Sequence, residues 1–148
     1  MRITLKGLAQ FMTSRPARQR KILRDFKFPD PEGRAKALYY AEARRAVHAF
    51  HSQDNDVGIL VRTSLRLERR ALEAEAAAAR RLRNNVSALT QYATCFAGQR
   101  YEVLPNRHLQ LEYGPVVVAV APDLHVLERR REKVVKVEFT KEEMVSHS

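Results

Sequence analysis

Residues 89–104, LTQYATCFAGQRYEVL, contain the change of pattern that decides the fold. Up to Gly98 the apolar residues follow helical spacing, and from Arg100 onward β-branched, aromatic and alternating residues take over. The pattern before this point predicts helices, and the pattern after it predicts strands. We therefore expect an α+β fold, with a helical part at 1–97, a β part at 98–140 and a polar tail at 141–148.

The segment just before this point, about 61–96, has the strongest helical pattern. Apolar residues recur there every seven positions, at Leu65, Leu72, Ala79 and Val86, around the Ala-rich stretch LEAEAAAARRL. The pattern predicts one helix of roughly 50 Å, or two helices broken near Asn84 and Asn85. One long helix would overhang a small core, so we also predict that 61–96 contacts a second copy or a partner protein.

Three shorter helices are predicted further upstream, at about 4–12, 15–26 and 31–51. Thr4 is suited to cap the first helix, and Ser14 to cap the second, with Pro16 in its first turn. The inward face of the second helix is predicted to hold Ala17, Ile22, Leu23 and Phe26. The prolines of FPDPEG separate the second helix from the third.

Downstream of Gly98, five short stretches read as strands: RYEVL, HLQLEY, VVVAVA, DLHVLE and KVVKVEF. The separators LPNR, YGP, AP and ERRRE predict turns, so we expect a small antiparallel β-meander of three or four strands at about 100–139. The chain has 148 residues, no internal repeat and no clear linker, which favours a single domain, 1–148.

The amino-acid composition limits the cellular compartments and the kinds of site that we expect. Cys95 is the only cysteine, which excludes a disulfide framework within one chain and favours the cytoplasm. Cys95 lies in an apolar helical stretch, where thiols are usually inert. The longest apolar run, 116–121, is too short for a membrane helix, and the start of the chain has no signal-peptide pattern. We expect no membrane partner.

The formal charge of +10 is concentrated in two helical segments. Residues 1–30 carry eight Lys or Arg against Asp25 and Asp30, and residues 62–83 carry seven Arg against three Glu. Dense positive charge attracts polyanions and releases counterions when it meets phosphates. A helix on an anionic membrane would need an aromatic apolar face, which 62–83 lacks. We therefore predict DNA or RNA as the partner, with no cofactor needed for binding.

The predicted phosphate contacts come from both segments. They are Arg15, Arg18, Arg20, Lys21 and Arg24 in the second helix and Arg80, Arg81 and Arg83 in the fourth. The first two helices could also form a helix-turn-helix, with Gln19 among the residues at a groove. The alternative to phosphate contact is a basic face that only meets solvent. For residues 62–83 the alternative also includes pairing of Glu with Arg within the helix.

A second set of residues could support catalysis on the predicted sheet. Asp123 opens one predicted strand, and Lys136 and Glu138 lie two apart on the next, so that alternation places the latter pair on one face. Two carboxylates and an ammonium can hold Mg²⁺ or Mn²⁺ and steady a phosphate during hydrolysis. The alternative is ordinary strand-face charge beside a hairpin turn.

At this point the chain resembles the PD-(D/E)XK nuclease superfamily over about its last 40 residues. Pro122 and Asp123 match the family's Pro-Asp element at a strand start, whereas Lys136 and Glu138 stand in the reverse of the family's order. The resemblance implies a degenerate or truncated member with Asp123 and Glu138 as metal ligands and Lys136 as the catalytic cation. It also implies mobile-element or defence biology.

Three histidines are possible metal ligands. His48 and His51 lie three residues apart on a predicted helix, with Asp54 beyond them, and such a pair could bind a metal ion. The alternative to a metal site is an exposed helix end, whose negative dipole favours histidine. His125 shares a strand face with Asp123, and its alternative is a solvated strand residue.

Three functional hypotheses follow from these patterns. The leading one is a nucleic-acid-binding protein that contacts phosphates through its basic N-terminal helix and carries a degenerate nuclease-like sheet. The second is an active metal-dependent nuclease. The third is a helical assembly subunit of a larger complex, which uses residues 61–96.

Overall fold

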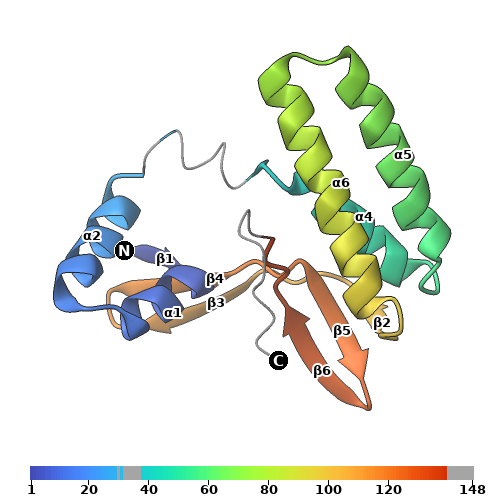
Figure 1. Cartoon of the computed structure of the whole chain (residues 1–148). Coiled ribbons are helices and arrows are strands. Elements are labelled where there is room, and N and C mark those ends of the chain that lie inside the picture. The colour runs from blue at the N-terminus through green and yellow to red at the C-terminus, as the bar shows by residue number, and fades with distance from the viewer. Residues whose placement is uncertain (30, 32–37, 140–148) are drawn as a thin grey trace, which may run out of the picture. The chain divides into compact units, whose positions relative to one another are not determined.

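The computed structural model describes residues 1–29, 31 and 38–139. It confirms the predicted α+β fold, with helices first and short antiparallel strands after them (Figure 1). The chain groups into two compact units, each built from two separate stretches. Unit 1 comprises Met1–Ala37 and Pro105–Pro122, and unit 2 comprises Leu38–Leu104 and Asp123–Ser148. That the whole chain is a single domain stays a prediction.

Unit 1 combines two helices with a three-stranded sheet of order β1-β4-β3. Strand β1 runs parallel to β4, and β3 pairs antiparallel with β4. The elements are β1 (Arg2–Thr4), α1 (Leu5–Thr13), α2 (Pro16–Lys27), β3 (Leu109–Tyr113) and β4 (Val116–Val120).

Helix α1 packs closely on both α2 and β1 in unit 1. The hydroxyl of Thr4 accepts a hydrogen bond from the N–H of Gly7, which confirms Thr4 as the cap of α1. A Cβ at Gly7 would lie 2.3 Å from the ring of Phe26 and 3.2 Å from Ile3, so only glycine permits this approach. The buried apolar residues of the sheet are Ile3, Val118 and Val120, and Ile3 lies beside Val118 in the register of β1 with β4.

Three local predictions for unit 1 were wrong. Strand β1 was missed, because three residues are too few to show alternation, and its pairing with β4 spans over a hundred residues. The N-cap of α2 is Arg15, without a side-chain hydrogen bond, whereas Ser14 ends α1 by donating its N–H to the carbonyl of Phe11. Ala17 is exposed, because the inward face of α2 is set by Ile22, Leu23 and Phe26.

Unit 2 contains three helices and a second three-stranded sheet, which is antiparallel and has the order β2-β5-β6. Its elements are α4 (Ala41–Ser52), α5 (Val57–Glu73), α6 (Ala76–Phe96), β2 (Glu102–Leu104), β5 (Leu124–Glu128) and β6 (Arg131–Val135). Of the predicted helix 31–51, residues 32–37 lie outside the described part of the chain.

The main hydrophobic core lies in unit 2, where helices α4, α5 and α6 pack together and β5 supplies two side chains from the sheet. The largest fully buried apolar side chains of the described residues are Phe50, Leu67, Leu89, Leu124, Val47 and Val126. Asn85 is also fully buried, and it accepts a hydrogen bond from the N–H of Ala43 and donates to the carbonyls of Tyr39 and Arg81. This asparagine fixes the start of α4 against α6.

The predicted single helix 61–96 is wrong, and so is the predicted break near Asn84. Ala74 and Glu75 are both extended, with ψ of 155°, so the chain folds back there and α5 packs along α6 (Figure 1). Folding back buries Leu67 and Ala71 against the α6 side, which one extended helix could not do. Leu72, a predicted heptad position, is instead 80% exposed.

The last hairpin differs from prediction in its boundaries. Only Arg129 and Arg130, with φ of 50° and 64°, form the turn, so that β6 already begins at Arg131 inside the predicted separator ERRRE. Strand β6 ends at Val135, and Lys136 and Glu138 therefore follow the strand. None of the described helices is both long and apolar enough to cross a bilayer.

Candidate functional site

The net charge is divided unequally between the two units. Unit 1 has eleven Lys and Arg against four Asp and Glu, a net charge of +7, whereas unit 2 has sixteen against thirteen, a net charge of +3. Unit 1 is also the smaller of the two. The density of positive charge is therefore highest on unit 1, and most of it comes from α2 and the residues beside it.

Helix α2 has one half-buried apolar face and one exposed basic face. Ile22, Leu23 and Phe26 are half-buried. All five predicted basic residues, Arg15, Arg18, Arg20, Lys21 and Arg24, are exposed, and so is Lys27. Within the described residues, none of these six side chains forms an ion pair with an acidic group.

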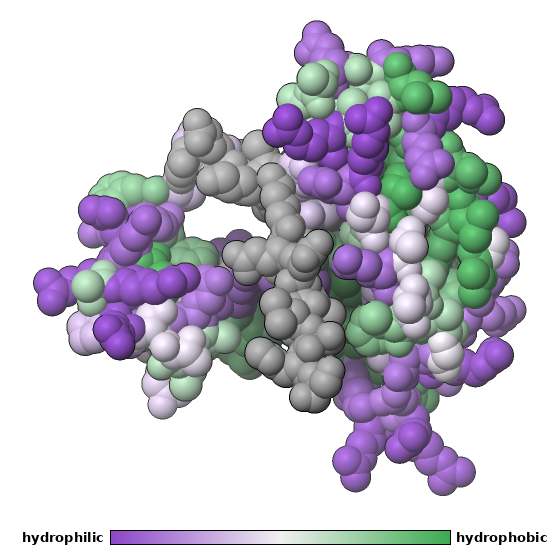
Figure 2. Space-filling model, viewed as in Figure 1, coloured by the Kyte–Doolittle hydropathy of each residue, from purple (hydrophilic) through white to green (hydrophobic). Residues whose placement is uncertain are grey.

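The exposed face of α2 has a regular spacing of cations. Arg20, Arg24 and Lys27 are four and three residues apart, which places them in one row along the helix. Lys27 was not among the predicted contacts, although its spacing from Arg20 and Arg24 could have identified it. In the space-filling view, hydrophilic residues gather over the region of α2 (Figure 2).

One residue predicted at a nucleic-acid groove has another role. Gln19 is half-buried, and its side-chain amide donates a 2.9 Å hydrogen bond to the carbonyl of Phe11 at the end of α1. Gln19 thus joins α1 to α2, and its place at a nucleic-acid groove stays a prediction. The two helices pack on each other, and both contact β1.

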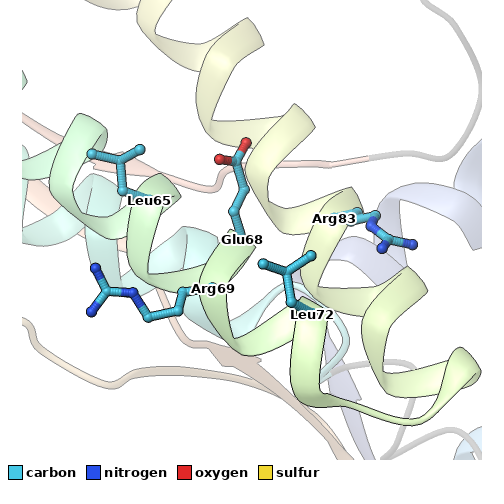
Figure 3. A pocket seen from close by; sticks show the side chains of 5 residues that line it. All are labelled: Leu65, Glu68, Arg69, Leu72 and Arg83. Carbon is cyan, nitrogen blue, oxygen red and sulfur yellow. The ribbon is translucent and has the colours of Figure 1, made fainter.

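The second predicted basic patch lies on α6, where Arg80, Arg81 and Arg83 are exposed. Arg83 lines a shallow groove between α5 and α6 (Figure 3), together with Leu65, Glu68, Arg69 and Leu72. Nearby arginines on α5 are used differently, because Arg66 and Arg70 lie 3.9 Å and 3.0 Å from the carboxylate of Glu42 on α4. Here charge also serves to join two helices.

Asp123 and Lys136, two of the three predicted catalytic residues, do come together. The side chain of Asp123 is 12% exposed, and Lys136 Nζ lies 3.3 Å from each of its carboxylate oxygens. Asp123 Oδ2 accepts a 2.8 Å hydrogen bond from the N–H of Val137, and Arg44 Nε lies 3.8 Å from Oδ1. The N–H of Asp123 donates to the carbonyl of Val135.

These contacts determine what Asp123 can do. Both its oxygens contact protein donors or cations, so the carboxylate joins the start of β5 to the chain that follows β6. Glu138 is exposed beyond that strand. In the described residues no group of three or more His, Cys, Asp or Glu side chains is placed to hold a metal ion. The geometry supports a structural role for Asp123.

The three histidines lie in different surroundings. His51 is buried, and its Nδ1–H donates to the Asn55 side-chain oxygen while its Nε2 accepts from the Tyr92 hydroxyl, both at 2.7 Å. Burial lowers the pKa of His51. His48 Nδ1 lies 3.3 Å from the Ser52 hydroxyl. The prediction of an exposed histidine pair was therefore wrong for His51, because it packs among aromatic rings.

A further prediction about a single residue was wrong. His125 is buried rather than solvated, since β5 is the central strand of its sheet, and its Nε2 lies 3.0 Å from a carboxylate oxygen of Glu132. Cys95 is exposed, because it lies on the outer side of the last turns of α6. Helical spacing alone did not show which side of α6 faces the core.

Comparisons with models of protein families, with curated proteins and with solved structures found no match for this chain.

Proposed function

We propose that this protein binds nucleic acid through phosphate contacts made by α2. The observation that carries the proposal is the row of exposed cations on that helix, which have no ion-pair partner within the described residues. No carboxylate of the described chain is bound to these cations to offset their attraction for a polyanion. Contacts of this kind are largely independent of sequence, since they involve the backbone of the nucleic acid.

The apolar face of α2 argues against a lipid surface as the partner. A helix that lies in a membrane interface inserts its apolar side between the lipids. In α2 that side holds Phe26, whose ring packs against Gly7, and it is therefore already used within unit 1. The cations remain available to phosphates in solution.

The test compares two triple variants that remove the same amount of charge. One carries Arg20→Gln, Lys21→Gln and Arg24→Gln on α2, and the other carries Arg80→Gln, Arg81→Gln and Arg83→Gln on α6. Binding to a short labelled DNA duplex, and to RNA of the same sequence, is measured by fluorescence anisotropy between about 50 and 200 mM salt. The α2 variant should weaken binding and lower the slope of log K against log salt by roughly 2 to 3.

The α6 variant distinguishes α2 from general positive charge. A smaller loss of affinity for the α6 variant supports α2 as the main contact. Equal losses would show that only the overall charge matters, and a loss confined to the α6 variant would overturn the assignment to α2. Wild-type binding that does not change with salt would overturn phosphate contact altogether.

A further inference from the structure

Strand β3 forms one border of the sheet in unit 1 (Figure 1). One side of β3 pairs with β4, and no strand of the described chain pairs with its other side. All five of its residues are exposed. An unpaired strand edge presents free N–H and C=O groups to any strand of matching register.

An apolar row runs along this free edge. Leu109, Leu111 and Tyr113 pair with Val120, Val118 and Val116, so their side chains point to the sheet face on which Val118 and Val120 are buried. Yet Leu109, Leu111 and Tyr113 are 42%, 59% and 86% exposed. Edge strands are usually protected by lysine, proline or an inward-pointing charge. β3 has none of these, and Glu112 is its only charged residue.

We infer that β3 pairs antiparallel with β3 of a second copy of this chain, which joins two three-stranded sheets into one of six strands. The sequence LQLEY is self-complementary around Leu111. With a twofold axis at that residue, Leu111 faces Leu111 of the second copy, Leu109 faces its Tyr113, and Gln110 faces its Glu112. Apolar residues then meet apolar residues on one face, and an amide meets a carboxylate on the other.

The backbone pattern is compatible with the same register. Tyr113 and Val116 flank the two-residue turn Gly114-Pro115, and residues that flank such a turn form a hydrogen-bonded pair. Alternation along β3 then directs the peptide groups of Gln110 and Glu112 to the free edge. These two residues face each other when the axis lies at Leu111. An axis at Glu112 would instead oppose two carboxylates.

The pairing has a consequence for the rest of unit 1. A twofold axis normal to the sheet keeps both copies of α2 on the same side of it. Two basic helices would then face one polyanion, and the second contact would benefit from the high effective concentration that the first creates. The inferred dimer does not depend on nucleic-acid binding, so the two can be tested separately.

The first experiment measures the mass of the full chain by sedimentation equilibrium without nucleic acid over a range of concentrations. Leu111→Lys places two ammonium groups opposite each other at the axis, and it should raise the dimer dissociation constant at least about tenfold. Leu72→Lys, at an exposed leucine on α5, is the matched control and should leave the dimer unchanged. A wild-type chain that stays monomeric, or equal effects of the two variants, would overturn the inference.

The second experiment tests the register directly. In a Cys95→Ser background, Leu111→Cys brings two thiols opposite each other with Cα atoms about 4.5 Å apart, which a disulfide can span. Mild oxidation should therefore give a covalent dimer. Gln110→Cys, whose side chain would face Glu112 of the second copy, should cross-link more slowly. Equal cross-linking rates for the two variants would contradict a twofold axis at Leu111.

Discussion

The basic residues of α2 in unit 1 and the arginines around Glu42 in unit 2 differ in whether an acidic side chain of the described residues pairs with them. In unit 2 the carboxylate of Glu42 lies within 3.9 Å of guanidinium nitrogens of Arg45, Arg66 and Arg70. The hydrogen bond from Arg70 lowers the pKa of Glu42. In unit 1 the cations of α2 have no such partners among the described residues. Charge that is paired holds helices together, and charge that is left unpaired creates an attractive field.

The two units also differ in how many large side chains they bury. All the largest fully buried side chains of the described residues belong to unit 2, whereas the buried apolar side chains of unit 1 are Ile3, Val118 and Val120. Because stability follows buried apolar area, unit 2 should dominate it. Unit 1 buries fewer apolar side chains and has the higher density of positive charge. Three predictions test this contrast.

The largest expected effect concerns two phenylalanines. Phe50 is fully buried in unit 2. Phe50→Ala should lower the free energy of unfolding by about 3–5 kcal/mol, because the substitution leaves a cavity. Phe28 follows α2 in unit 1 and is 68% exposed, so Phe28→Ala should change stability by less than about 0.5 kcal/mol. Urea unfolding followed by circular dichroism measures both, since the chain has no tryptophan. Similar losses would remove the contrast in packing.

A smaller effect is expected when a paired and an unpaired carboxylate are removed. Asp123→Ala leaves the N–H of Val137 without its acceptor, and the cost should be about 1–3 kcal/mol. Asp25 on α2 is exposed and forms no ion pair in the described chain, so Asp25→Ala should be nearly neutral, within about 0.5 kcal/mol. Unfolding free energies of the two variants decide the matter. An unchanged stability of Asp123→Ala would mean that this carboxylate is not structural.

The smallest effect is a dependence of stability on pH. Since burial lowers the pKa of His51, the unfolded chain binds the proton more readily than the folded one. The stability from this group is complete above the unfolded pKa of about 6.5 and falls below it by at most about 1.4 kcal/mol per pH unit. Unfolding free energies at several pH values between about 7.5 and 5.5 should show this loss.

Two variants separate His51 from the other titrating groups. His51→Gln cannot gain the proton, so its stability should fall less steeply with acid, although it starts lower. His108, which is exposed in unit 1, should keep the wild-type slope when changed to Gln. If His51→Gln and the wild type lose stability equally, the buried histidine is not the source of the acid sensitivity.

Helix positions were predicted well where a short signal was sufficient. Thr4 as a cap and Pro16 in the first turn located α1 and α2 to within about one residue, because capping depends on neighbours a few residues away. The exposed basic face of α2 followed from the placement of its apolar residues. The chain reversal at Ala74 was missed, since alanine favours helix and no cap or proline marks the break.

The candidate site was predictable only in part for a related reason. Asp123 and Lys136 were expected to be close, and they are, because hairpin neighbours are set by local register. Arg44 comes from a helix almost eighty residues earlier, and no local pattern announces that contact. The sequence therefore predicted that Asp123 and Lys136 lie close together, but it could not show that both carboxylate oxygens of Asp123 contact donors or cations of the protein.

The α+β composition, the basic face of α2 and the change from helix to strand at Gly98 can be predicted from local sequence, since each depends on residues close together in the chain. Three features are visible only in the folded chain: which strands share a sheet, which histidines are buried and which strand edge has no partner among the described residues. Those features depend on contacts between distant segments, such as β1 with β4, and their free energy comes from burial that no short stretch can show.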